Sequence, residues 1–140
     1  MTSHIVVQLS EDPSDSSVPS ASFTNELITA LVAREDVAVT ILGDSRTIAS
    51  RADGAEAEVV DLATANLPAI TASADAVVQS HPFQPRPLHL PTVTVVHDMS
   101  AYTTPWAWGT DRAASVRSLH KNLIRADAVV TPYPALVDQL

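Results

Sequence analysis

The stretch TVTVVHDMSAYTTPW, residues 92–106, joins a strand pattern to an abrupt polar ending. Thr92–Val96 consists of β-branched residues only, which is typical of a strand that a parallel sheet buries on both faces. His97 and Asp98 follow at once, and a loop with aromatic side chains comes after them. The stretch therefore predicts a buried strand that carries an ionisable pair to its own carboxyl end.

The same strand pattern alternates with helical patterns along the rest of the chain. We predict strands over 5–9, 37–42, 58–62, 75–79, 92–96 and 128–131, and helices over 20–34, 64–73, 111–125 and from 134 onward. Apolar strands that alternate with helices indicate a parallel sheet with helices on both faces. The prediction is a doubly wound, Rossmann-like α/β fold in a single domain over residues 1–140, with Val129–Val130 among its buried strand residues.

Composition excludes several classes of function. The net charge of -8 argues against nucleic-acid binding, which needs clustered Lys and Arg. The absence of Cys excludes disulfides and thiolate chemistry, and no spacing of His and acidic residues indicates a metal site. The N-terminus lacks the basic region of a signal peptide, and no apolar run approaches the ~20 residues of a membrane span. We therefore expect no integral membrane segment and a cytoplasmic location.

Polar residues follow several predicted strands, at the edge where ligands bind in open α/β sheets. They are His81, the pair His97-Asp98, and Thr131 with Tyr133. A histidine held at the end of a buried strand could bond a hydroxyl or pair with a phosphate, and Asp98 could orient His97. The alternative is that His97 and Asp98 only cap their loop. His4 begins the first strand at the opposite edge, so we expect a structural role for it.

Three stretches together resemble the N-terminal domain of retaining glycosyltransferases of the GT-B fold, family 4. They are PSASFTNELITALVAREDVAVTILGD (19–44), PTVTVVHDMSAYTTPW (91–106) and HKNLIRADAVVTPYPALVDQL (120–140). The resemblance implies sugar transfer from a nucleotide-sugar donor, without a metal or another cofactor. It assigns a contact with the donor sugar to His97, and acceptor contacts to Tyr102, Trp106 and Trp108. Together with the strand-end positions, the predicted catalytic residues are His97 and Asp98. The predicted substrate-binding residues are His81, Tyr102, Trp106, Trp108 and Tyr133.

The resemblance also implies partners. Family members bind the acceptor, a sugar or lipid, on this domain and the donor on a second domain that this chain lacks. A separate donor-binding domain or chain is therefore expected, the chain alone should be inactive, and its uncovered edge could support self-association. The loop aromatics could instead pack onto the sheet. The alternative function is a non-catalytic Rossmann-like binding or interaction module that has lost the donor site.

Two charge patterns bear on these alternatives. The loop SEDPSDSSVPSAS (10–22) has no glycine and carries Glu11, Asp12 and Asp15, which would repel a diphosphate. Arg117, Lys121 and Arg125 share one face of the predicted helix over 111–125. That face could meet an anionic lipid or acceptor, or it could simply be solvated.

Overall fold

The computed structural model describes residues 1–9, 18–44, 47, 57–82, 88–97, 99 and 112–140. Within these residues, strands and helices alternate as the sequence predicts. The strands are β1 (Ser3–Gln8), β2 (Val37–Gly43), β3 (Glu58–Asp61), β4 (Ala76–Gln79), β5 (Thr92–Val95) and β6 (Ala128–Val130). The helices are α1 (Val18–Val32), α3 (Leu67–Ser73), α5 (Arg112–Arg125) and the 3-10 helix η3 (Pro134–Gln139).

The strands form one six-stranded sheet in the order β3-β2-β1-β4-β5-β6, and every pairing is parallel. The predicted Rossmann-like α/β class is therefore confirmed. β1 lies at the centre and pairs with β2 on one side and β4 on the other. The chain changes its direction of winding between β1 and β4, and such a point is where α/β sheets place their ligands.

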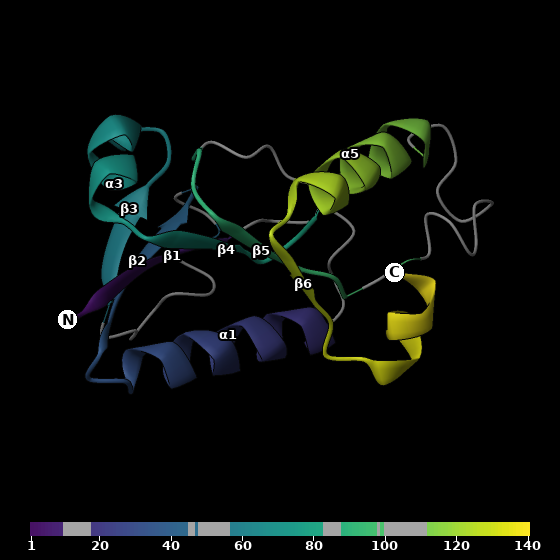
Figure 1. Ribbon diagram of the computed structural model, residues 1–140, viewed down its shortest axis with the longest axis horizontal. Coiled ribbons are helices and arrows are strands. Elements are labelled where there is room, and N and C mark those ends of the chain that lie inside the picture. Colours follow the sequence, from purple (N-terminus) through teal and green to yellow (C-terminus); the bar gives the residue numbers. More distant parts are fainter. Residues whose placement is uncertain (10–17, 45–46, 48–56, 83–87, 98, 100–111) are drawn as a thin grey trace.

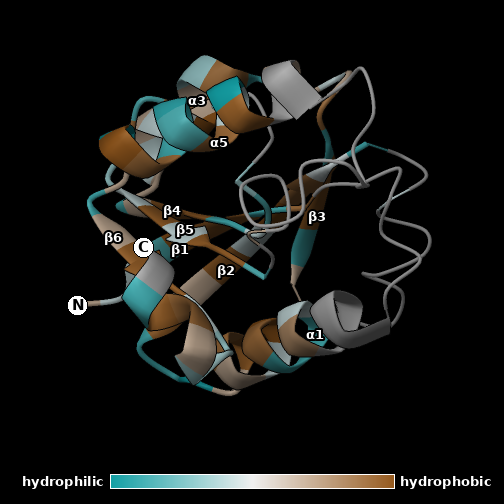
Figure 2. Cartoon of the chain, turned by 90° about the vertical axis from the view of Figure 1, so that its right-hand side faces the viewer, coloured by the Kyte–Doolittle hydropathy of each residue, from teal (hydrophilic) through white to brown (hydrophobic). Residues whose placement is uncertain are grey.

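Helices cover both faces of the sheet (Figure 1), with α1 on one side and α3 and α5 on the other. On the α1 side, Val7 and Ile41 pack with Ile28 of the helix. On the other side, Val6, Val77 and Leu88 form a second cluster. Val6 and Val7 are adjacent yet both fully buried, because successive side chains of a strand point to opposite faces. Figure 2 shows the hydrophobic residues along the strands, between the helical layers.

The amino edge of the sheet carries a network around His4. Its backbone N–H donates to Asp75 Oδ2 at 2.8 Å, and its ring nitrogens lie 3.1 Å from the Ser73 carbonyl and 2.8 Å from Thr40 Oγ1. Thr40 in turn donates to Glu58 Oε2 at 3.1 Å. These bonds join β1, β2, β3 and the end of α3, so the structural role expected of His4 is confirmed.

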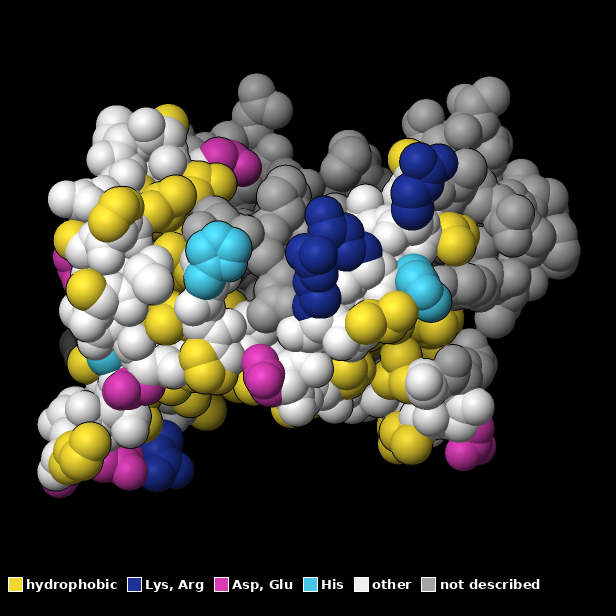
Figure 3. Space-filling view, turned by 45° about the horizontal axis from the view of Figure 1, so that its top comes forward, with side chains coloured by type: hydrophobic (Ala, Val, Ile, Leu, Met, Phe, Trp, Pro, Cys, Tyr) yellow, Lys and Arg dark blue, Asp and Glu magenta, His cyan; other side chains and the backbone are white. Residues whose placement is uncertain are grey.

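Helix α5 has a buried side and a charged side. Leu119 is fully buried with Val96 and Met99, and Leu123 packs against them. Arg117, Lys121 and Arg125 are exposed. Figure 3, in which the top of the molecule is turned forward, shows Lys and Arg side chains in dark blue on this side.

The prediction that Val129 and Val130 are buried is wrong. Within the described part of the chain, β6 pairs with β5 alone and lies at the edge of the sheet. All of its residues are exposed, with Val129 at 38% and Val130 at 41%. An edge strand lacks one neighbour, and its sequence alone does not reveal that position. Separately, among the described helices none combines the length and the apolar character that a membrane crossing requires.

Candidate functional site at the carboxyl edge of the sheet

Two histidine loops lie at the same edge of the sheet. Gln79 of β4 is opposite Thr94 of β5, so the two strands end side by side. His81 follows β4 and His97 follows β5, each after a short run of chain. Both histidines therefore lie at the carboxyl edge of neighbouring strands, as the sequence predicts, while their role in binding or catalysis stays a prediction.

His97 packs against helix α1. Its imidazole lies 5.5 Å from the ring of Phe23, centroid to centroid, with 73° between the ring planes. The residue as a whole is half-buried, and both of its ring nitrogens are buried. This edge-to-face geometry is the one that aromatic quadrupoles favour. The helix thus covers one side of His97, which limits the directions from which a ligand can approach.

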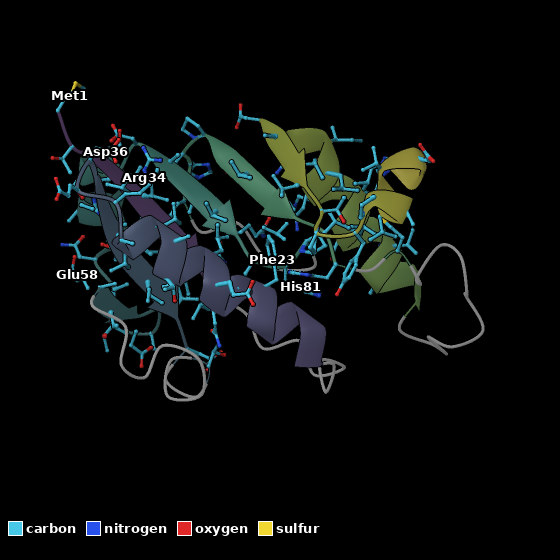
Figure 4. The ribbon with its side chains drawn as sticks, turned by 90° about the horizontal axis from the view of Figure 1, so that it is seen from below. Met1, Phe23, Arg34, Asp36, Glu58 and His81 are labelled. Atoms are coloured by element: carbon cyan, nitrogen blue, oxygen red, sulfur yellow. The ribbon has the colours of Figure 1, made fainter. Side chains whose placement is uncertain are left out.

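Hydrogen bonds tether the backbone on both sides of His81. Before it, the backbone N–H of Ser80 donates to the carbonyl of Gln8 in β1 at 3.1 Å. After it, the carbonyl of Pro82 accepts a hydrogen bond from Nδ2 of Asn122, which belongs to α5. His81 itself is only 8% exposed. In Figure 4, His81 and Phe23 lie near the middle of the view, whereas Met1, Arg34, Asp36 and Glu58 lie toward its left end.

A row of buried polar side chains lies just inside this edge. Gln8, Gln79 and Thr94 occupy opposing positions on β1, β4 and β5, and their exposed fractions are 3%, 0% and 0%. Thr94 Oγ1 donates to Gln79 Oε1 at 3.3 Å, which turns the amide nitrogen of Gln79 away from Thr94. Burying an amide costs free energy unless it is bonded. The row therefore places polar groups at the switch point, where apolar residues would pack more favourably.

Tyr133 lies to the side of this arrangement. It follows β6, which is one strand removed from His97 and two from His81. Its backbone N–H donates to Thr131 Oγ1 at 3.2 Å, which closes a short turn, and its side chain is 38% exposed. The other predicted site residues, Asp98, Tyr102, Trp106 and Trp108, lie outside the described residues.

Sequence reasoning missed Gln8, Gln79, Phe23 and Asn122 as parts of this edge. A signal existed for the glutamines, because each ends a strand of the form Val-Val-Gln. Across the described ranges, no group of three or more His, Asp or Glu residues could hold a metal ion. The chemistry available here is that of imidazoles, amides and an aromatic ring.

No family model matches the sequence, and no curated protein matches it. Among solved structures, the fold is similar to the crystal structure of TvaF, an FMN-dependent cysteine decarboxylase from thioviridamide biosynthesis. The TM-score is 0.54, the sequence identity is 12%, and the match covers 99% of this chain and 94% of the other. The likeness therefore extends over the whole sheet and its helices.

This finding corrects the resemblance to GT-B glycosyltransferases. The similar structure is a flavin-dependent enzyme, so the predicted transfer of a sugar from a nucleotide-sugar donor is wrong, and so is the family-4 identification. The similar structure also gives no support to the alternative function, a non-catalytic binding or interaction module. The physical reason is that the three matching stretches consist of apolar strands and amphipathic helices. These features belong to the parallel α/β architecture and carry no particular chemistry.

The predictions about cofactor and partners depended on the glycosyltransferase resemblance and are corrected as well. No cofactor was expected, whereas the similar enzyme depends on FMN. The sugar or lipid acceptor and the separate donor-binding partner rested on glycosyl transfer, and both are withdrawn with it.

Proposed function

We propose that this chain is a flavin-dependent enzyme that binds FMN at the carboxyl edge of β1, β4 and β5. The observation that carries the proposal is that Phe23 packs on His97 at the edge where His81 also lies, since β4 and β5 end side by side. It occurs in a fold whose similarity to an FMN-dependent enzyme extends over 99% of the chain. The edge adjoins the switch point of the sheet, where this architecture generally holds its ligands.

The residues at the edge suit a flavin. The isoalloxazine ring is a flat aromatic system with a polar rim, and pockets for such groups combine apolar walls with a few placed polar groups. Phe23 and His97 supply an aromatic wall. Backbone N–H groups that follow the strands would supply neutral donors for the phosphate.

The chemistry would be divided between the cofactor and the chain. FMN, when bound, supplies the electron-accepting ring. The chain would orient that ring and handle protons, and histidine is the side chain best suited to gain and lose a proton near neutral pH. His81, which is buried and tethered on both sides, is the candidate proton carrier. His97, which is packed on Phe23, is the candidate for holding the ring in place.

The substrate proposal follows the similar enzyme, which acts on cysteine. We propose a small molecule or peptide end that carries a carboxylate beside a thiol. Imidazole groups at the edge could bond or protonate such groups, and the absence of cysteine from the chain means that no thiol of its own would compete.

Titration of FMN with the purified chain tests the proposal. Bound flavin changes fluorescence when its ring leaves water, so saturable quenching is expected, weaker for riboflavin because that lacks the phosphate. Phe23→Leu should weaken FMN binding, whereas Ile124→Ala, which alters an exposed residue on α5, should not. Absence of saturable binding by the wild-type chain at millimolar FMN would overturn the proposal.

A further inference from the structure

Helix α5 supports both histidine loops through one buried side. Leu119 and Asn122 are three residues apart in the helix and so share a face, and their exposed fractions are 0% and 5%. Each of them contacts a different loop at the carboxyl edge. The helix is therefore a common support for two segments that are far apart in the sequence.

The contact to the His97 loop is apolar. Leu119 packs with Val96 and Met99, which lie on either side of His97 in the sequence. Val96 is in turn held by its backbone, because its N–H donates to the carbonyl of Val130 at 2.8 Å. Packing of this kind fixes the distance between helix and strand but does not orient a polar group.

The contact to the His81 loop is polar and directional. Asn122 Nδ2 donates to the carbonyl of Pro82, the residue directly after His81. Pro82 has no backbone N–H, so its carbonyl is the one main-chain group through which it can be held by a hydrogen bond. With the bond from Ser80 to Gln8 on the other side, the backbone of His81 is fixed at both ends. Of these two tethers, only the Asn122 bond uses a side chain, so a substitution can remove it.

We propose that Asn122 is the positioning residue of His81. It acts through the Pro82 carbonyl, and it sets where the imidazole of His81 lies relative to His97. The meaning of this for catalysis rests on the proposed flavin-dependent function, but the positioning itself does not. An asparagine is suited to the role because its amide nitrogen can donate while its size lets it pack among the apolar residues of α5.

Two variants remove the bond in different ways. Asn122→Asp keeps the shape but replaces the donor with an oxygen, and Asn122→Leu keeps most of the volume without a polar atom. Lys121→Ala is the matched control, since it alters the neighbouring exposed residue of the same helix. Ile28→Val, in the core on the α1 side, controls for lowered stability without touching either loop.

The readout is the environment of His81 in the folded chain. The ring signals of each histidine are followed by NMR, and the rate of acylation by diethyl pyrocarbonate is followed by mass spectrometry. Exposed His89 and His120 serve as internal references. We expect both Asn122 variants to shift the His81 signal and to raise its acylation rate several-fold, with His89 unchanged and with no such effect in Lys121→Ala or Ile28→Val.

The outcomes separate this inference from the proposed function. If the His81 signal and reactivity are unchanged in both folded Asn122 variants, the inference is wrong, whatever the wild-type chain does with FMN. If one variant does not fold, the other decides. If His81 responds but wild type binds no FMN, the positioning role holds and the flavin proposal fails. If FMN binds, the Asn122 variants should lower turnover more than FMN affinity, because they move His81 and leave Phe23 in place.

Discussion

The rings of Phe23 and His97 meet edge to face, with their centroids 5.5 Å apart and an angle of 73° between their planes. Phe23 belongs to α1, near the beginning of the chain, and His97 follows β5 on the far side of the switch point. The contact therefore joins the two halves of the sheet at the edge where a ligand is expected. It is both a packing interaction and part of the candidate site.

A double-mutant cycle should measure this contact. We expect Phe23→Leu and His97→Leu to be coupled by about 0.5–1.5 kcal/mol in the free energy of unfolding, the usual range for aromatic pairs. The measurement is urea unfolding of wild type, both single variants and the double variant. A coupling energy of zero would mean that the two rings are neighbours without a specific interaction. In that case the burial of His97 alone would account for any effect of its removal.

The exposure of β6 predicts unequal effects at two paired positions. Val95 and Val130 are opposite one another on β5 and β6, yet their exposed fractions are 2% and 41%. Val95→Thr should lower the free energy of unfolding by about 1–3 kcal/mol because it buries a hydroxyl. Val130→Thr should change it by less than about 0.5 kcal/mol. Thermal or urea unfolding of both variants decides, and equal losses would show that β6 is covered in solution.

The network at the amino edge should matter for stability and not for ligand binding. Thr40→Val removes the hydroxyl that contacts His4 and donates to Glu58, so we expect a loss of about 1–3 kcal/mol. Thr29→Ala is the control, since the Thr29 hydroxyl donates within its own helix, to the carbonyl of Asn25. FMN titration of Thr40→Val should match wild type. A weakened FMN complex would indicate that the two edges of the sheet are coupled.

The pair Arg34–Asp36 predicts a small dependence of stability on pH. The hydrogen bond from Arg34 holds the pKa of Asp36 below its ordinary value of 3.8. The pair therefore contributes stability that is present above pH 3.8 and is lost as pH falls through the lower, folded pKa. The effect should be slight, because both side chains are more than half exposed. In Arg34→Gln, NMR titration should show the Asp36 pKa moving up toward 3.8. An unchanged pKa would mean that the ion pair does not persist in solution.

The fold was predictable because its signals are local and repeated. Each Val-Val pair in β1, β4 and β6 predicted its strand, and the β-branched run predicted β5. The apolar helical face of Leu119 and Leu123 predicted α5. The place of each strand in the order of the sheet was not predictable in this way. Val129–Val130 has the composition of a central strand but lies at the edge, since strand order depends on crossovers that no short stretch encodes.

The site was predictable only in part. His81 and His97 were identifiable because parallel strands end at one edge, so residues that follow them come together. The contact of Phe23 with His97 depends on how far α1 extends over that edge, which its helical pattern does not specify. Asn122 was detectable in principle, because it stands three residues after Leu119 on the buried side of α5. A polar residue at such a position needs a partner, but only the fold identifies it as the Pro82 carbonyl.

The central place of β1 has a consequence for the order of folding. β1 is the first strand of the chain, and its pairing with β2 spans about half the sequence distance of its pairing with β4: Val6 is opposite Thr40 in β2, whereas Ile5 is opposite Ala76 in β4. Doubling a loop adds only about 0.6 kcal/mol to its closure entropy, but distant pairings still form more slowly. We expect β1, α1 and β2 to assemble first and β4 to join them later. The carboxyl edge between β1 and β5 would then exist only in the finished fold, so partly folded chains would have no site to offer a ligand.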